Sequence, residues 1–147
     1  MTKRASLLIL AFLLSIASFA TAGARPQSSD RDHPTPVRAN GIDGELDGSG
    51  DESFFSFVAA RGELTLTVDV KSSTGQALLN FELLDKTASK ALICCEFAQA
   101  DGDGQSARDT KSVKLAKGQI VILHTTVGKS GTGTYRVRFS GTAVHQG

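Results

Sequence analysis

The feature that most constrains the fold is a repeated alternation of apolar and polar residues with a period of two. It is clearest in residues 64–70 (LTLTVDV) and returns in residues 135–139 (YRVRF). Successive side chains of a β-strand point to opposite faces of a sheet, so this pattern places one set in a core and the other in water. No stretch after Asn40 carries a helical apolar stripe over three turns. The chain after Asn40 is therefore predicted to be all-β.

Other short apolar segments have the same character and are separated by turn-forming residues. Residues 120–124 (IVILH) are apolar on both faces, which predicts a central strand, and a shorter strand is expected around Val113 and Leu115. Seven to eight short strands with turn signals between them are typical of an antiparallel sandwich or barrel. The remaining segments are 55–57, 79–83 and 93–97, and the turns are 60–62, 72–75, 101–104, 117–118 and 128–131.

The first 24 residues have the features of a signal peptide. Lys3 and Arg4 precede an apolar stretch from Leu7 to Ala20, and small residues then allow cleavage after Ala22 or Ala24. The apolar stretch is shorter than the roughly 20 residues that span a bilayer. An uncleaved N-terminal anchor is the alternative. We expect a secreted protein, extracellular or periplasmic, without membrane insertion after processing.

Three further segments complete the predicted organisation. Residues 25–40 hold all three prolines and one large aliphatic residue, Val37, and are expected to be a disordered linker because so little apolar surface cannot offset the ordering entropy. Residues 41–142 form the predicted β-sandwich domain, and residues 143–147 a frayed tail. Removing the signal peptide leaves 14 basic against 15 acidic residues, a balance without the basic excess that nucleic acid or an anionic membrane attracts.

The only cysteines are the neighbours Cys94 and Cys95. Adjacent side chains of a strand point to opposite faces, so the two can bond to each other only through a strained turn. One interpretation is a pair of small apolar strand residues, at least one of them buried. A vicinal redox pair or an intermolecular bridge is the other, and zinc is not expected because no further cluster stands at ligand spacing.

Catalytic and metal-binding patterns are sparse. Among the three histidines only His124 lies in a strand, where a structural role is more common than a catalytic one, and no enzyme is predicted. Five acidic residues in two Gly-rich turns have the oxygen ligands that calcium prefers, although neither turn is an EF-hand loop and turn formation by Asp and Gly is the favoured explanation. These weak calcium candidates are Asp47, Asp51, Glu52, Asp101 and Asp103.

Residues 44–57 (GELDGSGDESFFSF), 62–68 (GELTLTV) and 133–141 (GTYRVRFSG) together resemble the bacterial pre-peptidase C-terminal domain family. The resemblance covers residues 41–142 and implies a β-sandwich of jelly-roll type, usually appended to secreted hydrolases. Some relatives bind calcium near the start of the domain, which implies Asp47, Asp51 and Glu52 here. The chain departs from the family in having Ser53 where a second Asp is frequent, and we expect no attached peptidase.

The function expected from the sequence is that of a secreted, non-catalytic binding or adhesion module. Its partner would be an extracellular or envelope protein, a polysaccharide or an envelope surface, contacted by loops or by one sheet face. The first alternative is a structural or assembly subunit that pairs through strand edges or through Cys94 and Cys95. A hydrolase is the minor alternative. No cofactor other than calcium is expected.

Overall fold

The computed structural model describes residues 27–37, 41–86 and 90–144, and all regular elements in these ranges are β-strands. The predicted signal peptide, with its cleavage sites, lies outside the described residues. No helix in the described ranges has the length and apolarity needed to cross a membrane. The strands are β1 (Thr35–Pro36), β2 (Gly41–Leu46), β3 (Glu52–Val58), β4 (Gly62–Thr74), β5 (Ala77–Asp85), β6 (Ala91–Ala100), β7 (Ser106–Leu115), β8 (Ile120–Val127) and β9 (Thr132–Ser140).

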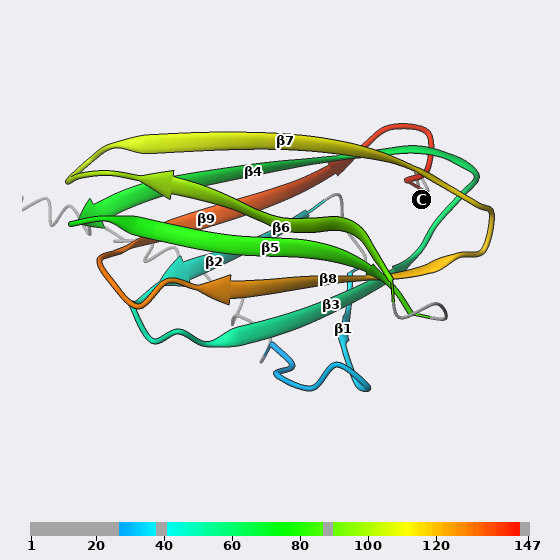
Figure 1. Cartoon of the computed structure of the whole chain (residues 1–147), viewed down its shortest axis with the longest axis horizontal. Helices are drawn as coiled ribbons and strands as arrows, with labels where there is room; N and C mark the ends of the chain where they lie inside the picture. The colour runs from blue at the N-terminus through cyan, green and yellow to red at the C-terminus, as the bar shows by residue number, and fades with distance from the viewer. Residues whose placement is uncertain (1–26, 38–40, 87–89, 145–147) are drawn as a thin grey trace, which may run out of the picture.

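The strands form two sheets that pack face to face (Figure 1). The five-stranded sheet has the order β1-β3-β8-β5-β6 and the four-stranded sheet the order β2-β9-β4-β7. All pairs are antiparallel except β1 with β3. From β2 to β9 the chain changes sheet at every connection but the one between β5 and β6, as in a jelly roll. The predicted antiparallel sandwich of jelly-roll type is confirmed.

The core between the sheets is built from the alternation that the sequence displays. In β4 the inward residues Leu64, Leu66, Val68 and Val70 are all at most 1% exposed. Tyr135, Val137 and Phe139 of β9 continue this layer, and Leu79, Leu83 and Leu123 cover it from the other sheet. Removing these side chains from water provides the main stabilisation of the fold. Strand β8 lies between β3 and β5, so the predicted central strand is also confirmed.

Strand β7 is longer than the sequence indicates. The sequence predicts a short strand around Val113 and Leu115, whereas β7 begins at Ser106 and pairs with β4 along its whole length. It is the edge of the four-stranded sheet, and only Leu115 in it is buried. Main-chain hydrogen bonds to β4 hold an edge strand without a continuous apolar face, which explains why its polar first half gave no strand signal.

The N-terminal segment differs from the prediction of a disordered linker over residues 25–40. Within 27–37 the short strand β1 pairs with β3, and the N–H group of Phe54 donates to the carbonyl of Ser28 at 2.8 Å. Val37 also donates a main-chain hydrogen bond to β3. These contacts satisfy the open edge of β3, and Val37 also packs against the core, so main-chain pairing supplements the small apolar contribution of this segment.

The C-terminal end of the domain also differs from its predicted limit at residue 142. Ala143 is fully buried, and its N–H group donates to the carbonyl of Glu63 at 3.0 Å. The predicted frayed tail therefore does not begin at residue 143, because this alanine closes the core beside the start of β4. Residues 145–147 lie outside the described part of the chain.

Candidate functional site

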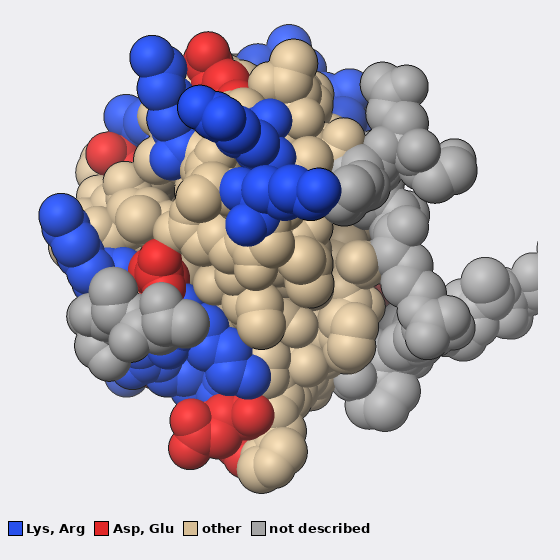
Figure 2. Space-filling view, turned by 90° about the vertical axis from the view of Figure 1, so that its right-hand side faces the viewer, with Lys and Arg blue, Asp and Glu red and all other residues tan. Residues whose placement is uncertain are grey.

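The two ends of the sandwich differ in charge. The end with the β3–β4, β5–β6 and β7–β8 connections carries Arg61, Lys86, Lys90 and Lys117, all exposed. Figure 2 looks at this end and shows Lys and Arg more prominently than Asp and Glu. The acidic turns at residues 47–51 and 101–104 are at the opposite end. A chain with a nearly balanced total charge thus separates its charges in space.

An open groove lies on the outer face of the four-stranded sheet. It has a volume of about 750 Å³ and crosses all four strands. Its charged lining comprises four cationic and two acidic residues, so its formal charge is positive. They are Lys71, Arg108, Arg136 and Arg138 against Asp43 and Asp69.

The charged side chains of this groove are held by ion pairs between strands. Asp69 on β4 pairs with Arg108 on β7 and with Arg138 on β9, each at 2.5 Å. Arg136 on β9 pairs with Asp43 on β2, also at 2.5 Å. Arginines at alternate positions of β9 face outward, as the sequence predicts, and the antiparallel register brings the acids beside them.

The environment of Asp69 favours its ionised form. Partial burial raises the pKa of this carboxyl group, but hydrogen bonds from Arg108 and Arg138 outweigh that effect, so the pKa lies below its usual value. The guanidinium groups contact the acids through single nitrogens, and each carries five N–H groups. Donors beyond those in the ion pairs are therefore available to a negatively charged ligand.

A second candidate region lies on the outer face of the five-stranded sheet, around His124 of β8. Its Nδ1 lies 2.8 Å from Oε1 of Glu82 on β5, and its Nε2 lies 3.5 Å from Oε2 of Glu52 on β3. The imidazole stacks on Phe54 with ring centroids 4.3 Å apart and planes inclined by 5°. The register pairs His124 with both Phe54 and Glu82, which explains why these side chains meet.

The hydroxyl of Thr126 lies 3.4 Å from Nε2 of His124. The hydroxyl of Thr126, the imidazole of His124 and the carboxylate of Glu82 are therefore successive neighbours in space, as in a hydrolase triad. Acyl-transfer chemistry also needs N–H donors aimed at the developing oxyanion. Strand β8 lies between two neighbours, and its N–H groups are committed to the sheet ladders. This region therefore gives no support to the hydrolase alternative, and His124 is best described as a side chain that orients Glu82.

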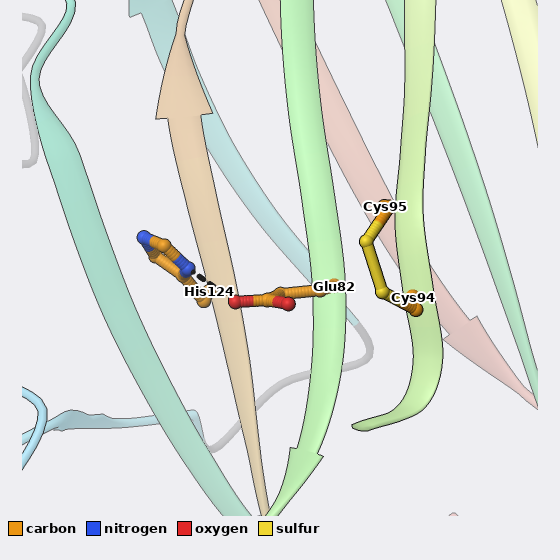
Figure 3. Close-up of a disulfide and its surroundings, with 4 residues drawn as sticks. All are labelled: Glu82, Cys94, Cys95 and His124. Carbon is orange, nitrogen blue, oxygen red and sulfur yellow. Dashed lines mark hydrogen bonds and ion pairs between the residues drawn. A yellow bond between two sulfur atoms is a disulfide. The ribbon is translucent and has the colours of Figure 1, made fainter. Parts of the chain in front are cut away.

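Cys94 and Cys95 form a disulfide with each other (Figure 3). Both residues are exposed. The interpretation as buried apolar strand residues is therefore wrong, and no turn is needed to join them. Between the pairs Phe81–Glu96 and Leu83–Ile93, β5 contributes one residue and β6 two, which is a β-bulge. Cys95 adopts a φ of 61°, so the usual alternation of faces is interrupted. In this state neither sulfur is available for an intermolecular bridge.

The disulfide lies beside Glu82, which in turn points toward His124 (Figure 3). A depression of about 210 Å³ adjoins these groups and is lined by Cys95, Glu82, His124 and four neighbours, Asn80, Phe81, Glu96 and Thr126. The sequence gives no signal for the meeting of Glu82 with the cysteines, because it depends on the pairing of β5 with the bulged β6.

The five calcium candidates do not form one cluster in the structure. Within the described ranges, no three of Asp47, Asp51, Glu52, Asp101 and Asp103 bring their carboxylate oxygens within 4.8 Å of one another. Asp47, Asp51 and Glu52 line an open depression of about 560 Å³ with Asp43 and Glu45.

Asp101 and Asp103 mainly stabilise turns. Asp103 accepts a hydrogen bond from the N–H group of Gly75, and Asp101 accepts from the amides of Gln76 and Gln99. These contacts join the β6–β7 turn to the β4–β5 turn. They agree with the interpretation of the acidic residues of this turn as turn formers.

No family model and no curated protein matches the sequence. Several solved structures have a similar fold. One is the pre-peptidase C-terminal domain of a collagenase from Bacillus anthracis, with 16% identity and a TM-score of 0.45 over 80% of this chain and 99% of that one. Another is a periplasmic inhibitor of g-type lysozyme from Aeromonas hydrophila, with 18% identity and a TM-score of 0.42 over 72% of this chain and 95% of that one.

A third similar structure is a carbohydrate-binding module in complex with calcium and xylotriose, with 16% identity and a TM-score of 0.41 over 67% of this chain and 88% of that one. At such identities the similarity concerns the arrangement of strands and does not extend to ligands. The family that the sequence motifs resemble, the pre-peptidase C-terminal domains, is thus represented among the solved structures that this chain resembles.

Proposed function

We propose that the protein is a secreted, non-catalytic binding module that holds an anionic polysaccharide in the groove of the four-stranded sheet. The observation that carries the proposal is the cationic lining of an open groove that crosses four paired strands. A depression of this shape accommodates an extended polymer, and the sheet beneath it supplies a rigid support.

The lining favours an acidic ligand over a neutral one. Neutral sugars are bound largely through exposed aromatic rings, and Tyr135, the aromatic residue of this lining, is only 4% exposed. Arginine, by contrast, matches the geometry of carboxylate and sulfate groups and donates two parallel hydrogen bonds to them. Uronate or sulfated sugar units are therefore the ligand class that the groove fits.

The two aspartates of the groove support this role by fixing the arginines. Asp69 holds Arg108 and Arg138 in place, and Asp43 holds Arg136. A side chain that is already oriented loses less conformational entropy when a ligand binds. The aspartates also make the groove selective among anions. The negative groups of a ligand must be spaced so that they meet the arginines and avoid the two aspartates.

The test is calorimetric titration of the purified protein with polygalacturonate, with dextran as a neutral polymer of comparable size. We expect binding of the acidic polymer alone, weakened by salt because exposed charges are screened. Arg136→Gln removes one charged donor, whose hydrogen bonds contribute about 1.5–3 kcal/mol, so the affinity should fall by tenfold or more.

Arg61→Gln is the matched control, since Arg61 is exposed but lies at the end of the sandwich outside the groove. It should leave the affinity within about twofold, as expected for a distant charge in salt. Equal binding of dextran, or equal losses in the two variants, would contradict the proposal.

A further proposal is calcium binding at Asp47, Asp51 and Glu52, which line one depression. Carboxylates suit this ion, and hydrogen bonds from Ser49 lower the pKa of Asp47 and keep it ionised. A ligand present at 100 times its dissociation constant stabilises a fold by about 2.7 kcal/mol. A thermal melt that is unchanged in millimolar calcium would exclude a site of that affinity.

A further inference from the structure

Three metal-ligating side chains meet on the outer face of the five-stranded sheet, away from the groove. One carboxylate oxygen of Glu82 and the sulfurs of Cys94 and Cys95 all lie within 4.8 Å of one another. Within the described ranges this is the only group of three such residues. Both cysteines are exposed, so a solute can reach the sulfurs from the solvent.

The main chain brings these ligands together, independently of the bond between the sulfurs. The bulge places two consecutive residues of β6 opposite Glu82 of β5. Regular pairs from Ala77–Ala100 to Phe81–Glu96 flank it on one side, and on the other the pair Leu83–Ile93 precedes a second register shift. The positive φ of Cys95 turns its side chain to the same face as that of Cys94. The regular ladder that ends at Phe81–Glu96 is made by main-chain pairing, so we expect the three groups to stay close when that bond is open.

The disulfide itself contributes little to holding the fold together. The stabilisation that a disulfide gives through the unfolded chain grows with the length of the loop it closes. Adjacent residues close the shortest loop that exists, whereas a disulfide between distant strands would restrain the whole domain. A chemical role of the two sulfurs therefore explains the presence of this cysteine pair better than a contribution to the stability of the fold does.

We propose that reduction of the Cys94–Cys95 disulfide creates a site for a thiophilic divalent cation, Zn²⁺ or Cd²⁺. The ligands are the two thiolates and the carboxylate of Glu82, and a water molecule or an external ligand takes the fourth position. Thiolates favour soft and borderline metal ions, and Zn²⁺ accepts a tetrahedral set of sulfur and oxygen ligands. The oxidised protein lacks both thiolates and so lacks the site.

The reaction balances with a dithiol as the reductant. One thiolate of the reductant attacks a sulfur of the disulfide, and its second thiol resolves the mixed disulfide. The reductant leaves as a disulfide, and Cys94 and Cys95 receive two electrons and two protons. Binding of the cation then releases two protons as both thiols become thiolates.

His124 acts as a positioning residue for Glu82. Its Nδ1 lies 2.8 Å from Oε1 of Glu82, and stacking on Phe54 fixes the plane of the ring. A hydrogen bond to a carboxylate ligand orients it toward the metal ion, and loss of such a partner lowers metal affinity by roughly 10- to 100-fold.

The experiment compares Cd²⁺ binding by the purified protein before and after treatment with dithiothreitol and its removal under anaerobic conditions. Titration of thiols with a chromogenic disulfide verifies that two thiols per chain have appeared. We expect one Cd²⁺ per reduced chain, with the ultraviolet charge-transfer band of cadmium thiolates, and no such band for the oxidised chain. A tight cadmium complex of the oxidised chain, or no complex of the reduced one, overturns the proposal.

Variants separate the ligands from the fold. Cys94→Ser and Glu82→Gln should each weaken Cd²⁺ binding by tenfold or more, while Glu63→Gln, an exposed acid on the other sheet, should have no effect. His124→Ala should weaken binding, and His124→Asn, which keeps an N–H donor, should restore most of it. Equal affinities for Glu82→Gln and Glu63→Gln, or a disulfide that dithiothreitol does not open in the folded protein, also overturn the proposal.

Discussion

The two outer faces of the sandwich share one core but are built differently. The four-stranded sheet turns charged and hydroxyl side chains to the solvent, as an antiparallel sheet with one wet face does. The five-stranded sheet carries a second apolar cluster on its outer face, where Ile122 is 1%, Phe54 7% and Leu84 9% exposed. One sheet is therefore apolar on a single side, and the other on both sides over part of its area.

This difference separates two kinds of chemistry. On the four-stranded sheet, Arg108, Arg136 and Arg138 are exposed and are held only by ion pairs, which suits reversible contact with a charged polymer. On the five-stranded sheet, part of the outer face is apolar. The polar part is a small region beside the disulfide that includes the imidazole of His124. Ligand binding on one face therefore need not involve the other, and variants can test each face separately.

The largest effect that distinguishes the faces is expected for Ile122→Ala. Ile122 is almost fully buried on the outer face of β8, so its truncation should lower the free energy of unfolding by about 2–5 kcal/mol. Thr134→Val is an isosteric change at an exposed position of the groove and should alter it by less than about 0.5 kcal/mol. Denaturant titration measures both, and equal losses would mean that the outer faces do not differ as described.

A smaller effect is expected for Gly44→Ala at the floor of the groove. A Cβ atom there would clash with ring carbons of Tyr135, which is buried and cannot move aside without disturbing the core. Overpacking of this kind costs about 1–3 kcal/mol. Gly102→Ala is the control, because its added Cβ would meet only the side chain of Gln105 at 3.7 Å. Denaturant titration should show the loss for the first variant only.

The smallest effect concerns the pH dependence of the groove. The lowered pKa of Asp69 means that its ion pairs stabilise the fold above the unfolded pKa of about 3.9, and this contribution is lost as the pH falls through the lower folded value. Asp69→Asn should therefore be less stable than the parent at neutral pH, by up to about 1 kcal/mol. This difference should shrink below pH 4.

Thermal melts of the two proteins between pH 2 and 7 measure this difference. Glu45→Gln serves as the control for the removal of an acidic residue that makes no ion pair with these arginines. A difference between Asp69→Asn and the parent that stays constant over the whole range would contradict the assignment of the ion pairs to the stability of this face.

The sequence predicted the outward orientation of Arg136 and Arg138 but not the groove that they line. Orientation follows from alternation within one strand, which is a local property. The partners of the arginines come from other strands, since Arg138 and Asp69 are 69 residues apart in the chain. Arg108 was missed altogether, because it belongs to the polar half of β7, an edge strand without an apolar pattern.

The cysteines show the opposite case, in which a correct local rule led to a wrong interpretation. Adjacent residues of a regular strand do face opposite sides, and on that basis a bond between Cys94 and Cys95 is expected only in a strained turn. The bulge in β6 interrupts the alternation of faces at these two positions, so both side chains lie on the same face. A bulge is defined by the partner strand, and nothing in the residues 93–97 by themselves indicates which residues of β5 lie opposite.

The amino-acid sequence by itself determined the class of fold and the faces of the strands, because a period of two in hydrophobicity is stable only when one side of a sheet is buried. It also determined the central place of β8, whose residues are apolar on both sides. The tertiary structure alone decided which side chains meet. The groove of the four-stranded sheet and the cluster of Glu82 with the two cysteines both depend on register between segments far apart in the chain, and register is a property of the paired strands together.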